Sequence, residues 1–467
     1  MLETSLDPIL AGFERLRESS PSRVLVLSPR RQATVQEVHT MAERIAERLF
    51  AYGLQPESLL ALTVGNGPMF LAAFLATRRC GMVPLLIDST TPPDERARIA
   101  GALGAAAVLS SPGWGDPAEA LEVATLAGQP RLLPADTAAV KLTSGSTGQP
   151  RGIVAPCAAL AADEAQLSST MGLVESDRLL AMVPMSHSYG LSSLAMPALL
   201  RGCALVVPEE REPFAPLRAA AACNATFIPA VPAWLGALVR VSEPPPWPAS
   251  VRLVISAGAP LAADTAARFR VLFGQPVHVF YGASECGGIC YDREGGAAER
   301  GTVGTPVDGV RLRLGAEDGR VSVISAAVAT GMIPEPSPFL AGGVFTTSDL
   351  GECHDGELRL RGRADDLVIV KGKNVNPREV ESVLRQLAGV EDVAVLGVPR
   401  PGTGELTLRA VVVCRPGAVA YESVVSWCRS RLALHKVPRN VVFVEALPRT
   451  ERGKVDRAAL LALKGGK

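Results

Sequence analysis

A strand–helix–strand pattern near the N-terminus constrains the fold of this chain more than any other feature. Residues 58–64 (SLLALTV) form a short apolar run, and the turn residues 65–68 (GNGP) follow it directly. The apolar spacing of 69–79 is typical of a helix, and 82–87 (MVPLLI) is a second run of strand length. Consecutive parallel strands need a crossover of this kind, so the pattern predicts a parallel sheet covered by helices.

The same pattern returns later in the chain. Residues 251–256 predict a strand, 261–273 a helix that Gly274 ends, and 277–281 a further strand. Between 301 and 363 the segments are short, bounded by glycine and rich in β-branched residues, which predicts a small antiparallel unit. The remaining residues are again βαβ-like. We therefore predict an α/β fold with a large N-terminal domain of packed α/β subdomains plus a small β unit, followed by a small α+β C-terminal domain.

The composition excludes several classes of function. Of 467 residues, 48% are hydrophobic and 20% charged, which is typical of globular chains. Lys+Arg and Asp+Glu are 47 each, so the basic excess of a nucleic-acid-binding protein is missing. The apolar stretches are too short for a membrane span, and the N-terminus lacks a signal-peptide pattern. The nine cysteines are scattered, and Cys286 and Cys290 have no second pair nearby, so we expect reduced thiols in a cytoplasmic protein rather than a zinc site.

Charge divides the chain into two parts, which we predict to be its domains, residues 1–363 and 364–467. The second part holds 17 Lys and Arg against 11 Asp and Glu, a net charge of +6, and the first part holds 30 against 36, a net charge of −6. A basic lobe would suit an anionic ligand, although such asymmetry can also simply aid solubility. Only seven of the 47 basic residues are lysines, and Lys141 is the one that lies before residue 364.

The segment 141–152 (KLTSGSTGQPRG) is the most distinctive in the chain. Gly145 and Gly148 leave backbone N–H groups uncovered, and the hydroxyls beside them can donate to phosphate oxygens. Arg151 adds a full positive charge. The segment does not match the nucleotide-binding loop GxxxxGK[ST]. Its composition is also typical of a flexible linker, but apolar runs flank it directly.

Further polar segments carry possible binding chemistry. They are 187–190 (HSYG), 281–285 (YGASE), 348–349 (SD), 362–366 (GRADD) and 448–457 (PRTERGKVDR). Tyr281 can stack on a base, and Glu285 can hold Mg²⁺. Read singly, each segment is equally explained as a turn or a basic tail, and a lone histidine such as His187 is more often structural than catalytic.

The order and spacing of these motifs are specific. The series TSGSTGxPRG, HSYG, GAPL (258–261), YGASE, SD, GRxxD and a late GK resembles the adenylate-forming superfamily of acyl- and aryl-CoA synthetases, peptide-synthetase adenylation domains and luciferases. The resemblance covers nearly the whole chain, up to Lys454. In this family a carboxylate attacks the α-phosphate of ATP to give an acyl-adenylate and pyrophosphate. A thiol, usually that of coenzyme A, then displaces AMP.

The resemblance implies a role for each matching residue. The triphosphate would be held by Thr143, Ser144, Gly145, Ser146, Thr147, Gly148 and Arg151. The adenosine and α-phosphate would be held by Gly258, Ala259, Pro260, Tyr281, Gly282, Ser284, Asp349 and Arg363. Glu285 would bind Mg²⁺, and Lys454 would bridge the substrate carboxylate and the α-phosphate. His187 is the third candidate catalytic residue.

The family pattern also implies a mobile C-terminal domain. Asp365 occupies the hinge position, and after adenylation the domain would turn, withdraw Lys454 and present the loop at Gly372 to the thiol. The sequence departs from the pattern at Arg151, where the family usually has lysine, and between 314 and 348, which is shorter than usual.

The acid is expected to lack an α-amino group. Amino-acid-activating members place an aspartate where residues 185–187 stand, and none is present. The predicted pocket (187–190, 227–234 and 254–258) is mostly apolar and suits an aryl or aliphatic acid. We therefore expect an ATP-, Mg²⁺- and CoA-dependent acid–thiol ligase. The alternatives are transfer to a carrier-protein phosphopantetheine or an amine, and a degenerate nucleotide-binding homologue.

Overall fold

A computed structural model of the protein describes residues 7–144, 150–210, 212–316, 318–370, 373–400, 406–449 and 455–463. The chain divides into two compact units. The first comprises residues 1–313, 322–346 and 355–358, and the second comprises 314–321, 347–354 and 359–467. The predicted boundary after residue 363 stays a prediction.

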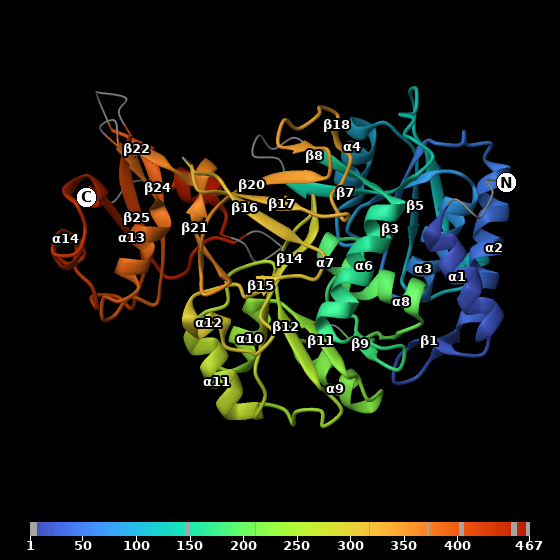
Figure 1. Ribbon diagram of the computed structural model, residues 1–467, viewed down its shortest axis with the longest axis horizontal. Helices are drawn as coiled ribbons and strands as arrows, with labels where there is room; N and C mark the ends of the chain where they lie inside the picture. The colour runs from blue at the N-terminus through green and yellow to red at the C-terminus, as the bar shows by residue number, and fades with distance from the viewer. Residues whose placement is uncertain are drawn as a thin grey trace. The chain divides into compact units, whose positions relative to one another are not determined.

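One sheet of the first unit has seven strands (Figure 1). In sheet order they are β18 (Gly331–Ile333), β8 (Pro150–Pro156), β7 (Thr137–Ser144), β4 (Val83–Leu86), β3 (Leu59–Val64), β5 (Ala105–Ser111) and β6 (Glu122–Thr125). The pairs β3–β4, β3–β5 and β4–β7 are parallel, whereas β7–β8, β8–β18 and β5–β6 are antiparallel. The parallel βαβ unit predicted at 58–87 is therefore confirmed.

The other large sheet of this unit has nine strands. In sheet order they are β15 (Thr305–Pro306), β14 (Gly287–Tyr291), β13 (His278–Ala283), β12 (Leu253–Ser256), β11 (Phe227–Ala230), β9 (Arg178–Leu180), β10 (Ala204–Val206), β1 (Val24–Leu27) and β2 (Gln32–Thr34). The strands from β13 to β1 are parallel, and β2, β14 and β15 run antiparallel to their neighbours. The second predicted βαβ unit is thus confirmed as β12–α11–β13.

Helices pack against both sheets of the first unit. They are α1 (Pro8–Ser19), α2 (Val35–Ala51), α3 (Pro68–Arg79), α4 (Pro93–Leu103), α5 (Pro117–Ala120), α6 (Cys157–Met171), α7 (Ser188–Gly190), the π-helical turn η1 (Leu191–Ala195), α8 (Met196–Arg201), α9 (Ala215–Ala222), α10 (Pro232–Leu238), α11 (Ala263–Phe273) and α12 (Ala297–Arg300). Helix α3 is buried along almost its whole length, as its apolar sequence requires. Helix α6 contacts β7 and β8 of one sheet and β14 of the other, so it joins the two (Figure 1).

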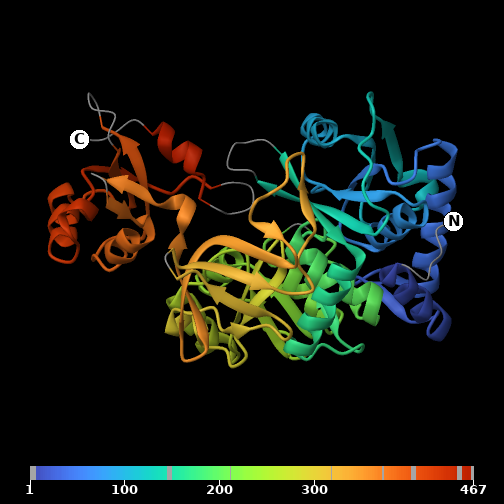
Figure 2. The ribbon, with the colours of Figure 1, turned by 45° about the horizontal axis from the view of Figure 1, so that its top comes forward.

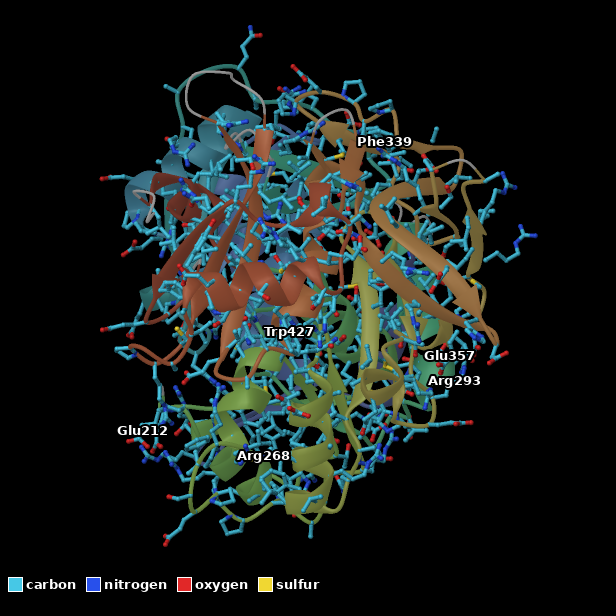
Figure 3. All side chains as sticks on the ribbon, turned by 90° about the vertical axis from the view of Figure 1, so that its left-hand side faces the viewer. Glu212, Arg268, Arg293, Phe339, Glu357 and Trp427 are labelled. Atoms are coloured by element: carbon cyan, nitrogen blue, oxygen red, sulfur yellow. The ribbon has the colours of Figure 1, made fainter. Side chains whose placement is uncertain are left out.

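The region 301–363 only partly forms the separate antiparallel unit predicted from the sequence. It supplies the five-stranded sheet of β16 (Arg311–Leu314), β17 (Arg320–Ile324), β20 (Val344–His354), β19 (Leu340–Ala341) and β21 (Glu357–Arg363). However, β15 pairs with β14 and β18 pairs with β8, so both join the large sheets as edge strands. Sequence periodicity does not reveal such long-range pairings. Glu357, the first residue of β21, is labelled in Figure 3 and belongs to the first unit. Its carboxylate accepts a hydrogen bond of 2.8 Å from the hydroxyl of Thr302 in the same unit.

The second unit continues from β21 as a small α+β arrangement. Its elements are the 3₁₀ turn η2 (Ala364–Asp366), β22 (Val368–Val370), β23 (Lys373–Val375), α13 (Pro377–Leu384), β24 (Asp392–Pro399), β25 (Leu406–Val413), α14 (Tyr421–Arg429), the 3₁₀ turn η3 (Leu434–Lys436), β26 (Asn440–Val444) and α15 (Arg457–Ala462). Strands β25 and β26 are parallel around α14, which confirms the βαβ-like pattern. Helices α13 and α14 pack on one face of the β24–β25–β26 sheet and α15 on the other (Figure 2). No helix in the described part of the chain is long and apolar enough to span a bilayer.

Candidate active site

The phosphate-binding segment predicted from the sequence joins two neighbouring strands. Thr143 of β7 lies opposite Arg151 of β8, and Ser144, which ends β7, pairs with Pro150. Gly145, Ser146, Thr147 and Gly148 lie outside the described residues. Because β7 is parallel to β4, the two strands end at the same edge of the sheet, and ligands of α/β sheets bind at such an edge. The side chain of Arg151 donates weakly, at 3.5 Å, to the carbonyl of Glu335.

The predicted adenosine-binding residues stand at the carboxyl ends of adjacent strands of the nine-stranded sheet. Gly258 follows β12 with a φ of +84°, a left-handed conformation that favours glycine. Ala259 and Pro260 are exposed beside it, and Tyr281 and Gly282 lie in the last residues of the neighbouring strand β13. The sheet therefore brings these segments to one edge although the sequence separates them.

Glu285 lies in the turn between β13 and β14, together with Ser284. The backbone carbonyl of Glu285 accepts a hydrogen bond of 2.8 Å from the N–H of Ala329. The next residue, Thr330, donates to the carbonyl of Val154 in β8 at 3.0 Å. These contacts connect the turn that carries Glu285 to the hairpin that carries the phosphate-binding segment.

His187 pairs with a carboxylate that the sequence analysis did not single out. Its Nε2 lies 2.8 Å from Oδ2 of Asp88, which follows β4. The other oxygen of Asp88 accepts hydrogen bonds from the backbone and hydroxyl groups of Thr90, at 2.8 and 2.7 Å. Burial opposes ionisation of Asp88, but the hydrogen bonds from His187 and Thr90 outweigh it and hold the pKa of this carboxyl well below its usual value.

The segment around His187 is fixed by further hydrogen bonds. Asn66, which follows β3, donates from its amide to the carbonyls of Ala181 and Val183 at 2.9 Å and accepts from the N–H of Met185 at 2.9 Å. The hydroxyl of Tyr189 donates to the carbonyl of Ala230 at 3.1 Å. Two of the three stretches of the predicted acid pocket therefore touch each other.

The aromatic ring of Tyr189 also lies beside a ring from β13. Its centroid is 6.0 Å from that of Phe280. The ring of Tyr189 is thus part of an apolar wall next to His187. This wall combines aromatic surface with one imidazole that can form hydrogen bonds, as a small-molecule pocket requires.

A buried carboxylate supports this region from helix α6. Asp163 accepts a hydrogen bond of 2.9 Å from the N–H of Gly288 at Oδ1, and its Oδ2 accepts one from the hydroxyl of Ser192. Lys141 on β7 is 3% exposed, and the charges of Asp163 and Glu285 act on it. Burial lowers the pKa of the Lys141 ammonium, and these two carboxylates oppose that change.

The predicted ribose-binding pair lies in the second unit. Arg363 of β21 donates from Nη1 to Oδ1 of Asp349 on β20 at 3.5 Å. The hydroxyl of Thr347 accepts a hydrogen bond of 3.0 Å from the N–H of Asp349, which holds the strand at this position. The two residues, fourteen apart in the sequence, are therefore neighbours. Asp365 lies in η2, while Gly372 and Lys454 are outside the described residues.

Two residues of this region were missed in the sequence analysis, Asp88 and Asp163. Asp88 directly follows an apolar strand of a parallel sheet, a position that could have marked it. Asp163 stands in the middle of a helix without a flanking motif, and no local pattern marks it.

Glu285 and its surroundings fit a magnesium ion that is shared with phosphate groups. Mg²⁺ is usually bound through one or two carboxylates together with substrate phosphates rather than by a cage of protein ligands. Glu285 supplies such a carboxylate next to the phosphate-binding hairpin. Within the described ranges, no group of three or more His, Cys, Asp or Glu side chains is placed to hold an ion alone.

Comparison with known proteins identifies the family of this chain. Residues 13–331 match the family model of the AMP-binding enzymes, and residues 379–454 match the model of the AMP-binding enzyme C-terminal domain. Feruloyl-CoA synthase from Amycolatopsis sp is 28% identical, over 94% of this chain and 96% of the relative. A long-chain-fatty-acid–CoA ligase from Mycobacterium tuberculosis is 29% identical, over 93% of this chain and 95% of the relative.

A solved structure shows the same fold over nearly the whole chain. ATP-bound MatB from Rhodopseudomonas palustris superposes with a TM-score of 0.82 at 27% identity, covering 98% of each chain. The match with the first family model alone covers more than half of the chain. The chain therefore belongs to the AMP-binding enzymes, the adenylate-forming superfamily, and is an AMP-forming ligase of the acid–thiol class.

Proposed function

We propose that this enzyme activates an aryl or aliphatic carboxylic acid without an α-amino group and transfers the acyl group to coenzyme A. In the first step a carboxylate oxygen bonds to the α-phosphorus of ATP and the bond to pyrophosphate breaks. In the second step the CoA sulfur bonds to the acyl carbon, AMP leaves, and the thiol proton is released. The similarity to CoA-forming ligases over almost the whole chain supports both steps.

The contacts of Asp88 carry the proposal about the acid. An α-ammonium group would need a carboxylate near His187, and Asp88 is the carboxylate found there. Its oxygens already accept three hydrogen bonds, from Thr90 and His187. A carboxylate engaged in this way is poorly suited to bind an ammonium ion, whereas His187 and the Tyr189–Phe280 wall suit an apolar acid.

We assign the nucleotide contacts to the residues that the sequence predicts for this role. Thr143 and Arg151 flank the segment that would hold the β- and γ-phosphates, and Arg363 and Asp349 would hold the ribose. A magnesium ion on Glu285 would neutralise charge on the phosphate oxygens. Lys454 would bring the acid carboxylate and the α-phosphate together, because an ammonium can bridge oxygens of two different groups.

The acceptor thiol is proposed to be CoA because the relatives that cover the chain form CoA esters. The net charge of +6 in residues 364–467 suits an anionic acceptor, and an acidic carrier protein would share this chemistry. Transfer to a carrier protein or to an amine is thus an alternative outcome of the test. The nine free cysteines agree with a reducing, cytoplasmic compartment.

The proposal is tested by pyrophosphate release from ATP across a panel of aryl, aliphatic and α-amino acids, each with and without CoA. We expect turnover with aryl or aliphatic acids, a marked increase when CoA is added, and an acyl-CoA detected by mass spectrometry. Higher activity with an α-amino acid than with its deaminated analogue would contradict the proposed substrate class. Turnover with an amine or a phosphopantetheinylated carrier protein, but not with CoA, would replace the proposed acceptor. The absence of pyrophosphate release with every acid would indicate a degenerate homologue.

A further inference from the structure

Asp163 on helix α6 makes two contacts that lead to two different parts of the proposed site. Its Oδ1 accepts the N–H of Gly288, at the end of the turn that carries Glu285. Its Oδ2 accepts the hydroxyl of Ser192, in the π-helical turn that continues from His187. Asp163 is 3% exposed, so both hydrogen bonds are shielded from water.

The turn between β13 and β14 passes very close to the carboxylate of Asp163. Gly287 has a φ of +70°, and a Cβ at this position would lie 2.1 Å from Oδ1 of Asp163 and 2.5 Å from its carboxyl carbon. Only a residue without a side chain fits between the β13–β14 turn and the carboxylate. The backbone of this turn therefore follows the position of Asp163 closely.

We propose that Asp163 is a positioning residue that fixes the Glu285 turn through Gly288 and the acid-pocket segment through Ser192. This inference rests on the proposed function, because it assumes that Glu285 binds the metal and that the segment 187–190 contacts the acid.

The proposed effect of Asp163 on metal binding by Glu285 is tested by Mn²⁺ binding, which does not depend on turnover. Electron paramagnetic resonance measures free Mn²⁺ in titrations of the protein with a non-hydrolysable ATP analogue. For D163N we expect Mn²⁺ affinity to fall by about tenfold or more, the effect typical of losing a group that orients a metal ligand.

Asp177 provides a matched control for the Mn²⁺-binding experiment. It is also 3% exposed and accepts hydrogen bonds from Arg252, Thr226 and the N–H of Val174. D177N should lower thermal stability and leave Mn²⁺ affinity unchanged. If D163N binds Mn²⁺ like the wild type, the inference is wrong. If the wild-type complex itself binds no Mn²⁺, the proposed role of Glu285 fails together with it.

The proposed effect of Asp163 on binding of the acid is tested independently by a smaller change that is not expected to impair folding. S192A removes the hydroxyl that donates to Asp163, and the neighbouring S193A removes a buried hydroxyl that has no hydrogen-bond partner among the described residues. We expect S192A to raise KM for the acid up to about tenfold, since the hydrogen bond that ties this segment to Asp163 is lost, with little change in KM for ATP. S193A should leave both values unchanged. Equal effects of the two variants on KM would overturn the role assigned to Asp163.

Discussion

The imidazole of His187 and the carboxylate of Asp88 are 2.8 Å apart although 99 residues separate them in the sequence. Asp88 follows a strand of the seven-stranded sheet, and His187 precedes the helix α7. A hydrogen bond from Nε2–H to a carboxylate selects one tautomer and leaves Nδ1 as the acceptor of the neutral ring. The hydrogen bond between the two residues therefore fixes which nitrogen of the His187 imidazole is the donor in the proposed acid pocket.

Replacement of Asp88 should impair activation of the acid more than folding. In D88N the oxygen of the amide can still accept from Thr90, but its NH₂ group faces the Nε2–H of His187, and the selected tautomer is lost. We expect kcat/KM for the acid, measured by pyrophosphate release, to fall about tenfold to a hundredfold, the range of one hydrogen bond to a charged group. D94N, an exposed aspartate in the first turn of α4, is the control. An equal loss in both variants would contradict the role of Asp88.

The stability contributed by Asp88 should depend on pH in a defined direction. Its pKa is lower in the folded protein than the usual value of about 3.9, so the unfolded chain takes up the proton first as the pH falls. The contribution is complete at neutral pH. Below about pH 4 it should decrease by about 1.4 kcal/mol per pH unit until the folded carboxyl also titrates.

Urea unfolding of the wild type and of D88N between pH 7 and pH 3 measures this dependence. The difference between their free energies of unfolding should be constant above about pH 5 and should shrink on further acidification. A difference that grows on acidification would show that the folded pKa is raised instead.

Lys454 is predicted to act in adenylation alone. Removal of one preorganised cationic donor in K454A should lower the rate of pyrophosphate release about 10²- to 10³-fold. A pre-made acyl-adenylate should still react with the thiol in this variant. The control is K436A, because Lys436 pairs with Glu379 at 2.7 Å and has no proposed role in the site. Equal losses in both half-reactions of K454A would overturn the assignment.

Asp365 is predicted to be the hinge about which the C-terminal domain turns between the two half-reactions. It lies in the short 3₁₀ turn Ala364–Asp366, and proline at this position would restrict the backbone dihedral φ to about −65°. We expect D365P to retain adenylation, followed by pyrophosphate release, and to lose transfer to the thiol, followed by single-turnover formation of the thioester. Survival of both steps would contradict a hinge at this residue.

Gly287 should tolerate alanine less well than another glycine with the same backbone conformation. Its φ is +70° and that of Gly274 is +69°, so both substitutions bear the cost of a left-handed residue, roughly 1–2 kcal/mol. A Cβ on Gly274 would meet no atom within 4 Å, whereas one on Gly287 would meet Asp163. In urea unfolding, G287A should therefore be more destabilised than G274A. Similar values would show that the turn can move away from Asp163.

Local sequence patterns were sufficient to predict the elements that carry the site. The apolar run 58–64 corresponds to β3, and the helix predicted at 261–273 corresponds to α11, which ends at Phe273 before the left-handed Gly274. Such features depend on neighbouring residues alone, since strand and helix periodicity and glycine caps are local. The order of the motifs likewise identified the family, because it is a property of the chain in one dimension.

Long-range relationships were decided by the tertiary structure. The pairing of β18 with β8 and the contacts of Asp88 and Asp163 join residues that are far apart in the chain. Nothing in the local sequence of α6 distinguishes Asp163 from an exposed helical aspartate. Its importance arises because packing between two sheets removes it from water, and a carboxyl group so buried must find its hydrogen-bond donors in other elements. The sequence by itself determined which groups were present, and the fold decided which of them became partners.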